Sequence, residues 1–143
     1  MAVLALFPGS FDPFTDGHEA ILRRVLPLFD KVVVAVGVNS EKHYMFSVEE
    51  RMERIRRRME DCPTVEVTSY SGMTIDLCHR LGAKAIVRGI RTAKDFEYEQ
   101  TVAAVNRLQD PSIETLLLMA DPEHIDISST LEREKLTHNQ HLS

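Results

Sequence analysis

The chain has 143 residues, a length that predicts a single domain over residues 1–143, with a core large enough to fold without a metal or a disulfide. With 43% apolar and 27% charged residues, its composition is that of a globular protein. The formal net charge of −5 argues against a general nucleic-acid-binding surface, because such surfaces carry an excess of cations. We therefore expect no nucleic-acid partner, and any site for anions must use a few well-placed cations.

The N-terminus and the cysteines indicate the compartment. Residues 2–7 are apolar but too few for a signal peptide, and no Lys or Arg precedes them. No run approaches the roughly 20 apolar residues of a membrane span. Cys62 and Cys78 lack the spacing of a metal site and are expected to be reduced, buried thiols. These features predict a cytoplasmic protein that does not contact a membrane.

Short apolar runs alternate with longer helical patterns along the chain. The predicted strands cover residues 3–7, 31–38, 65–69, 85–87 and 114–119. The predicted helices cover residues 18–29, 48–60, 74–81, 95–108 and a short stretch after Ser129. This alternation predicts a Rossmann-like α/β fold with a doubly wound parallel five-stranded sheet and helices on both faces. Ligands bind such sheets beyond the carboxyl ends of the strands, and residues 137–143 are expected to be frayed.

The first strand leads into the first helix through residues 8–18. Gly9 allows a close backbone approach or a positive φ directly after the strand. Asp16 is expected to cap the helix, with Glu19 three residues later, and this places His18 in the first turn. A lone histidine there is usually a surface residue. The glycines and the hydroxyl beside it favour a functional one, because a helix N-terminus attracts phosphate and a histidine can donate a ring N–H. Further along this helix, Pro27 predicts a kink or an end near Val25.

Cations follow the second strand. Lys42 lies in the loop before the second helix, where its position after a strand makes it a candidate ligand-binding cation. The second helix begins at a predicted capping box, Ser47 with Glu50, and carries a basic run. The arginines of this run are Arg51, Arg54, Arg56, Arg57 and Arg58. The pairs Glu50–Arg54 and Glu53–Arg57 stand four residues apart, so the run is predicted to be a solvated, self-paired face rather than an anion site.

Two arginines flank Gly89 at the end of the fourth strand. Arginine suits bidentate recognition of phosphate, and Gly89 lets the backbone approach a ligand. Alternatively, Arg88 and Arg91 pair with the acidic residues Asp95, Glu97 or Glu99 in a structural network, and both roles are compatible. We expect His18, Lys42, Arg88 and Arg91 to gather on one rim of the sheet, which would make the cleft of this acidic protein locally positive.

Three hydroxyl residues follow the last predicted strand, in Ile127-Ser128-Ser129-Thr130, and suit an anion, although any helix N-cap has a similar sequence. Neither a Walker-type loop nor GxGxxG is present. The candidate residues include no pair of nucleophile and base. The sequence therefore predicts a site that holds polyphosphate rather than one that forms a covalent intermediate.

These motifs resemble those of a known family. Thr15-Asp16-Gly17-His18 is similar to the T/HxGH signature of nucleotidyltransferases, and residues 127–130 with Arg133 resemble the ISSTxxR signature of the same superfamily. The run Arg88-Gly89-Ile90-Arg91, the segment 95–99 and Lys42 narrow the resemblance to bacterial phosphopantetheine adenylyltransferases, over residues 3–133.

The resemblance implies transfer of the adenylyl group of ATP to 4′-phosphopantetheine, giving dephospho-CoA and pyrophosphate in coenzyme A biosynthesis. It implies Mg²⁺ held mainly through the ATP phosphates, no metal-ligating residue, a homohexamer, and dephospho-CoA or coenzyme A as product or feedback ligand. The catalytic residues that it implies are His18, as transition-state stabiliser, Lys42 and Arg91. The implied ATP-binding residues are Ser10, Phe11, His18, Gly89, Ile90, Arg91, Glu99, His124, Ile125, Asp126, Ile127, Ser128, Ser129 and Thr130. The implied substrate-binding residues are Ser10, Lys42, Thr74 and Arg88.

The substrate phosphate is itself an anionic nucleophile, so an in-line transfer requires no strong base. Two alternatives stay open at the level of sequence. One is another adenylyl- or cytidylyltransferase of the same fold, and the other is a non-catalytic nucleotide-binding sensor.

Overall fold

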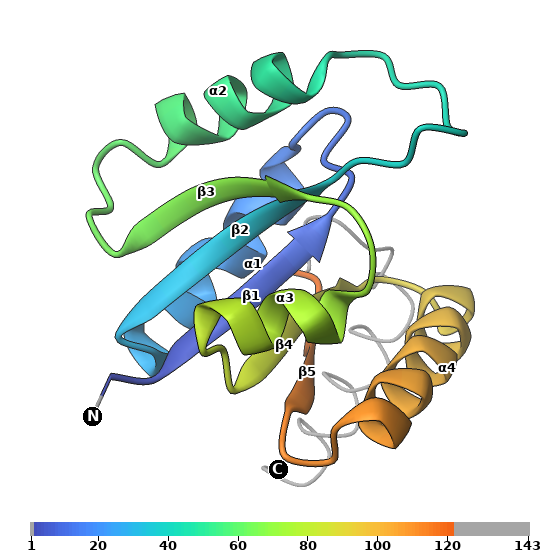
Figure 1. Cartoon of the computed structure of the whole chain (residues 1–143). Helices are drawn as coiled ribbons and strands as arrows, with labels where there is room; N and C mark the ends of the chain where they lie inside the picture. Colours follow the sequence, from blue (N-terminus) through green and yellow to red (C-terminus); the bar gives the residue numbers. More distant parts are fainter. Residues whose placement is uncertain (1, 122–143) are drawn as a thin grey trace, which may run out of the picture.

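The computed structural model describes residues 2–121. Their five strands form one parallel sheet. The strands are β1 (Leu4–Gly9), β2 (Lys31–Gly37), β3 (Val65–Tyr70), β4 (Ala85–Ile90) and β5 (Glu114–Met119). Their order across the sheet is β3-β2-β1-β4-β5 (Figure 1). The strand order reverses between β1 and β4, where the sheet opens a crevice beyond its carboxyl ends. The predicted fold class is confirmed.

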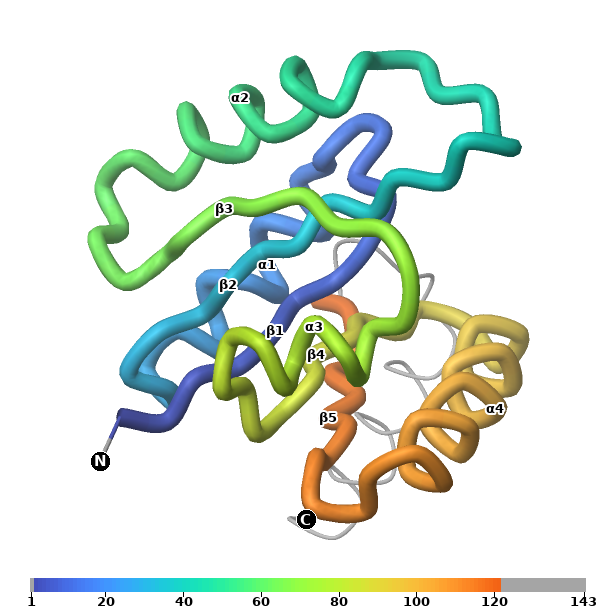
Figure 2. Tube along the Cα trace, in the orientation of Figure 1, coloured from blue at the N-terminus to red at the C-terminus, as the bar shows by residue number. Residues whose placement is uncertain are grey.

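Helices cover both faces of the sheet. They are α1 (Asp16–Val25), a 3₁₀ turn η1 (Leu26–Leu28), α2 (Val48–Arg58), α3 (Thr74–Leu81) and α4 (Ala93–Gln109). The apolar residues of α1 and α2 pack on one face of the sheet and those of α3 on the other (Figures 1 and 2). Within the described residues, none of the helices combines the length and apolar character needed to cross a bilayer.

Three strands run further than the sequence predicts, β3 by one residue to Tyr70 and the other two by more. β1 continues through Pro8 and Gly9, which pair in register with β2. β4 continues to Ile90 because β5 extends beside it, so Arg88 pairs with Leu117 and not with a loop. The site residues at these strand ends are therefore carried by the sheet itself. The predicted end of the first helix is confirmed, since α1 ends at Val25, immediately before the turn that contains Pro27.

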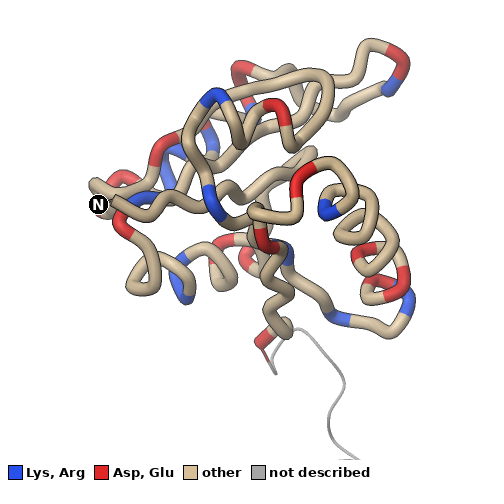
Figure 3. The backbone as a smooth tube through the Cα atoms, turned by 60° about the horizontal axis from the view of Figure 1, so that its bottom comes forward, with Lys and Arg blue, Asp and Glu red and all other residues tan. Residues whose placement is uncertain are grey.

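The basic run of α2 differs from its prediction. The Glu53–Arg57 pair forms, at 3.2 Å, but Arg58 reaches across to Asp16 of α1 at 2.7 Å. Arg51 is only 1% exposed and donates to backbone carbonyls, so the predicted solvated face is wrong at this position. The reason is geometric, because the first turn of α2 faces the end of the sheet. Elsewhere, cationic and anionic residues are interspersed along the chain (Figure 3).

Both cysteines are free thiols, as predicted, although only Cys78 is fully buried and Cys62 is half-buried. Burial, with a smaller contribution from Asp110, raises the pKa of Cys78 to about 11. The Cys78 thiol is therefore protonated at neutral pH and packs as a small apolar side chain against Leu6 and Ile86.

Candidate active site

Two adjoining cavities lie at the carboxyl ends of β1 and β4, where the strand order reverses. The first, the His18 cavity, is lined on its own side by Phe11, Asp12, Thr15, His18, Ile90 and Arg91. The second, the Thr74 cavity, is lined on its own side by Gly37, Tyr70, Thr74, Val102 and Asn106. The residues that line both cavities include Ser10, Lys42, Tyr44, Arg88, Tyr98 and Glu99. A ligand in one cavity therefore meets a ligand in the other beside Ser10, Lys42 and Arg88.

Thr15 and His18 form a reciprocal cap at the start of α1. The Thr15 hydroxyl accepts from the His18 backbone N–H at 3.3 Å, and the Thr15 N–H donates to His18 Nδ1 at 3.0 Å. The predicted cap at Asp16 is wrong, because Asp16 is already the first helical residue and its carboxylate pairs with Arg58. In this capping box His18 takes the third helical position, where glutamate is usual.

Aromatic rings hold the His18 imidazole. Phe14 stacks on it with the ring centroids 5.6 Å apart, and Phe11 meets it edge-on at 5.0 Å. Phe11 itself is buried and adopts a positive φ of 49°, and its ring folds back over Gly9. A Cβ on Gly9 would lie 2.9 Å from the Phe11 ring, so glycine is required there for this close approach and not for a positive φ.

His18 is neutral in the free protein. Burial, followed by the charges of Arg88 and Arg91, lowers the pKa of His18 to about 4. Because Nδ1 accepts the Thr15 N–H, we assign the ring proton to Nε2, which leaves an N–H donor for a ligand in the cavity. The predicted rim of four cations is therefore corrected to three cations and one neutral donor.

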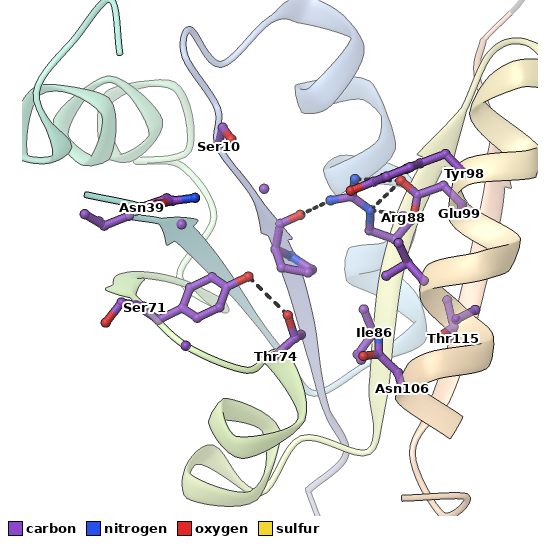
Figure 4. Close-up of a pocket in the computed structure, with 18 of the residues that line it drawn as sticks. Ser10, Asn39, Ser71, Thr74, Ile86, Arg88, Tyr98, Glu99, Asn106 and Thr115 are labelled. Carbon is purple, nitrogen blue, oxygen red and sulfur yellow. Dashed lines mark hydrogen bonds and ion pairs between the residues drawn. The ribbon is translucent and has the colours of Figure 1, made fainter. Parts of the chain in front are cut away.

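Arg88 lies between the two cavities in a fixed orientation. Its Nη2 donates to Glu99 Oε1 at 2.7 Å, its Nε donates to Oε2 at 2.9 Å, and its Nη1 donates to the Pro8 carbonyl (Figure 4). Glu99 is 4% exposed, so the pairing predicted for Arg88 is formed with a buried carboxylate. A guanidinium has five N–H groups, and these contacts leave two of them for a phosphate.

Arg91, Gly89 and Ile90 line the His18 cavity at the end of β4. The Arg91 side chain forms no ion pair with residues 2–121, whereas its backbone N–H donates to Asp95 at 3.0 Å. A Cβ on Gly89 would lie 3.0 Å from the Ile21 side chain. Glycine at this position thus lets α1 pack closely on the strand, which sequence reasoning attributed only to the approach of a ligand.

Lys42 is exposed and lines both cavities from the segment between β2 and α2. Its backbone N–H donates to the Asn39 carbonyl at 3.0 Å in a tight turn. Its Nζ lies 5.9 Å from the centroid of the Tyr44 ring. No carboxylate within the described part of the chain pairs with Lys42, so its charge is free to meet a phosphate.

The helix α4 faces the Thr74 cavity with an unusual pattern of burial. Its two buried residues are polar, Glu99 and Asn106, whereas Val105 and Leu108 are 47% and 87% exposed. The Asn106 side chain is directed into the cavity, and no described residue hydrogen-bonds its amide (Figure 4). Across the cavity, the Thr74 and Tyr70 hydroxyls lie 3.3 Å apart. The inner face of α4 is therefore polar where it borders this cavity, and its Asn106 amide is a hydrogen-bonding group that faces the cavity.

Known proteins resemble this chain in sequence and in fold. A cytidylyltransferase-like family model matches residues 6–135. A phosphopantetheine adenylyltransferase of Bacteroides fragilis is 48% identical over 139 residues, which cover 97% of this chain and 92% of the relative. The chain belongs to the phosphopantetheine adenylyltransferase family. The predicted resemblance is confirmed, and the protein is a nucleotidyltransferase.

Solved structures with lower identity share the fold. A putative nicotinate-nucleotide adenylyltransferase of Vibrio parahaemolyticus is 19% identical with a TM-score of 0.60, over 97% of this chain and 89% of that one. A bifunctional NMN adenylyltransferase/ADP ribose pyrophosphatase of Francisella tularensis is 20% identical with a TM-score of 0.64, over 85% of this chain. This chain spans 39% of that larger protein. These likenesses show that this chain shares the fold of both proteins.

The structure brings most of the predicted site residues together. The ones that line the two cavities are Ser10, Phe11, His18, Lys42, Thr74, Arg88, Gly89, Ile90, Arg91 and Glu99. The remaining predicted ATP-binding residues, together with Arg133, lie outside the described residues. These ATP-binding candidates are His124, Ile125, Asp126, Ile127, Ser128, Ser129 and Thr130.

Among the residues that shape the cavities and that the sequence did not indicate are Asn106 and Tyr44. Asn106 stands seven residues after Glu99, so the two share one face of a helix, and this spacing was the available signal. No sequence pattern indicated Tyr44, because its position beside the cavities depends on the path of the segment that precedes α2.

The described residues 2–121 contain no group of three His, Cys, Asp or Glu side chains that could hold a metal. The carboxylates near the His18 cavity are already engaged. The Asp12 and Asp95 carboxylates accept from backbone N–H groups, and Glu99 pairs with Arg88. A resident metal ion does not fit this part of the site.

Proposed function

We propose that this protein transfers the adenylyl group of ATP to 4′-phosphopantetheine, releasing pyrophosphate and dephospho-CoA. The observation that carries the proposal is the pair of cavities joined at Ser10, Lys42 and Arg88. A two-substrate transfer needs two binding spaces that meet where the bond forms. Family membership favours this reaction over the other nucleotidyl transfers and over a non-catalytic sensor.

We assign ATP to the His18 cavity and the pantetheine arm to the Thr74 cavity. A helix N-terminus, the His18 Nε2–H and the Arg91 guanidinium suit the polyphosphate of ATP. The pantetheine arm is a narrow chain that carries amide groups, and the unpartnered Asn106 amide and the Thr74 hydroxyl suit it. The acceptor phosphate then lies at the junction, beside Lys42 and Arg88.

The chemistry follows from these positions. An oxygen of the acceptor phosphate attacks the α-phosphorus of ATP in line, a new P–O bond forms, and the bond to the β-phosphate oxygen breaks as pyrophosphate leaves. The acceptor phosphate is anionic at neutral pH, so no residue has to remove a proton. The site contributes positioning and donors that face the developing negative charge, with the His18 Nε2–H the best oriented of them.

Magnesium belongs to this proposal as part of the MgATP substrate. The ATP phosphates and water hold it, in agreement with the engaged carboxylates of the described site. We expect chelation with EDTA to abolish turnover and excess Mg²⁺ to restore it. Restored activity at a metal concentration far below that of ATP would contradict a substrate-borne ion.

The reaction is tested by measuring pyrophosphate release from ATP with three acceptors: 4′-phosphopantetheine, nicotinamide mononucleotide and glycerol phosphate. We expect turnover with the first alone, with dephospho-CoA identified by mass spectrometry. Turnover with another acceptor only would favour a different transferase of this fold. Binding of ATP without turnover on any acceptor would favour the sensor.

A homohexamer, a cytoplasmic location and inhibition by coenzyme A complete the proposal, all by family resemblance. Light scattering after size-exclusion chromatography should give six times the chain mass of 16.3 kDa. Inhibition by coenzyme A should be competitive with 4′-phosphopantetheine, because the two molecules share the pantetheine arm. A monomeric mass, or the absence of such competition, would contradict the corresponding part.

A further inference from the structure

Arg51, in the first turn of α2, is the largest fully buried side chain among the described residues. No carboxylate within residues 2–121 forms an ion pair with it. Burying a guanidinium without a counter-ion is unfavourable unless hydrogen bonds compensate, and a methionine could fill the same volume without that cost. The reason for an arginine at this position therefore lies in what its N–H groups hold.

The Arg51 guanidinium joins three separate segments of the chain. Nη1 donates to the carbonyls of Ser10 at 2.7 Å and Gly37 at 3.1 Å, and Nε donates to the carbonyl of Phe46 at 3.2 Å. The Tyr44 ring covers the guanidinium, with Cζ 4.0 Å from the ring centroid. One side chain thus connects the loop after β1, the end of β2 and the segment that leads into α2.

We call residues 38–46 the Lys42 segment. It leaves the sheet after β2 and projects away from the body of the molecule (Figure 2). At its start, the Val38 N–H donates to the Tyr70 carbonyl. At its end, the Asp12 carboxylate accepts from the N–H groups of Met45 at 2.6 Å and Phe46 at 2.9 Å. Arg51 holds the same end from the other side, through the Phe46 carbonyl.

We propose that Arg51 is a positioning residue for the transfer reaction: by holding the Ser10, Gly37 and Phe46 carbonyls in one arrangement, it fixes the Lys42 segment opposite Arg88. The inference rests on the proposed function. Ser10 lies between Gly9, the last residue of β1 in register with β2, and Phe11 of the aromatic cluster, so its chain neighbours give it other supports. The Lys42 segment has fewer supports, so loss of Arg51 should affect the residue that meets the acceptor phosphate more than those that meet ATP.

The decisive variant is Arg51→Lys, which keeps the charge and most of the stem but replaces the planar fork by one ammonium. We expect the KM for 4′-phosphopantetheine to rise about tenfold, because charged hydrogen bonds to the segment are lost, while the KM for ATP stays within about twofold. Arg57→Met is the matched control, since Arg57 lies on the same helix, is exposed and pairs only with Glu53. It should change neither KM.

A double-mutant cycle with Lys42→Met shows whether Arg51 acts through Lys42. In the Lys42→Met background, Arg51→Lys should change kcat/KM for the acceptor by less than about twofold, because the group that it positions is gone. Additive losses would overturn the proposal. A lower melting temperature with both KM values unchanged would also overturn it, since that result describes a residue that only stabilises the fold.

Amide hydrogen exchange measures the local stability of the Lys42 segment independently of enzymatic activity. Exchange over residues 38–46 should be faster in Arg51→Lys than in the unmodified protein, and exchange in the central strands should be equal. Unchanged exchange in the segment would overturn the proposal, whether or not the unmodified protein makes dephospho-CoA. Failure of the unmodified protein to make dephospho-CoA would count against the proposed function alone. If the Arg51 variant does not fold, Asp12→Asn loosens the same end of the segment from a half-buried position and should give the same KM split.

Discussion

His18 and Lys42 line the same cavity but are held in opposite ways. His18 lies in the first turn of α1, bonded through Nδ1 to Thr15 and packed against two phenylalanine rings. Lys42 is exposed on a segment that has left the sheet, and its Nζ lies 5.9 Å from the centroid of the Tyr44 ring. The group proposed to face the transition state is thus fixed by local structure, whereas the group proposed to meet the acceptor depends on distant contacts.

This difference suits the two tasks. A donor that stabilises developing charge is most effective when it needs no reorganisation during the reaction. A lysine that captures a phosphate acts as a point charge on a flexible stem and tolerates a range of positions. The contrast predicts that changes around His18 lower kcat, whereas changes around Lys42 raise the KM of the acceptor.

The largest expected effect is that of His18→Ala. Removing the oriented Nε2–H should lower kcat by about 10²–10³, the usual loss for one preorganised donor. The KM for ATP should change little, because the helix N-terminus and Arg91 remain. Steady-state kinetics with both substrates varied checks this, and an equal loss in turnover and ATP affinity would contradict a transition-state role.

Lys42→Met should produce the next largest effect. It removes the unpaired cation at the junction and keeps the length of the stem, so the KM for 4′-phosphopantetheine should rise by about ten- to a hundredfold. Isothermal titration with the acceptor alone measures the same loss without catalysis. The contrast with His18 would fail if Lys42→Met lowered kcat and left acceptor binding intact.

Thr15→Val tests how firmly the cap holds His18. The hydroxyl that accepts the His18 N–H is lost, while the backbone N–H that donates to Nδ1 remains. We expect the free energy of unfolding to fall by about 1 kcal/mol, as for other lost N-caps. Urea unfolding measures this value, and kcat should fall only a few-fold because the tautomer is kept. A loss in kcat as large as that of His18→Ala would show that the hydroxyl has a direct role.

The smallest effect is expected far from both residues, at Asp110. Hydrogen bonds from the Ser112 hydroxyl and from His79 lower the pKa of Asp110 to about 2. Because this pKa is depressed in the fold, the ionised carboxylate stabilises the protein above its ordinary pKa, and the contribution is lost as the pH falls toward 2. Asp110→Asn should therefore reduce the pH dependence of the melting temperature between about pH 4 and pH 2 and leave both KM values unchanged. Parallel curves for the two proteins would contradict this assignment.

Much of the fold could be predicted from local patterns. The central strands β1 and β2 are largely apolar runs because they are covered on both faces, and α2 begins at a recognisable cap, Ser47. The order of the elements along the chain could therefore be predicted. The sequence-based predictions were wrong where contacts with other residues set the end of an element or its cap. β4 continues to Ile90 because β5 pairs with it, and Thr15 displaces Asp16 as the cap because His18 reaches back to it.

The sequence by itself determined the alternation of strands and helices, the family signature and the candidate residues that line the two cavities, because each depends on a short run of the chain. Only the tertiary structure decided how these residues act. The neutral state of His18 results from burial and from Arg88 and Arg91, which lie 70 and 73 positions away in the chain. The burial of Arg51 results from three carbonyls of three separate segments, and the polar face of α4 results from the cavity in front of it. Burial, charge and hydrogen-bond partners are properties of neighbours in space, which adjacent residues in the sequence do not specify.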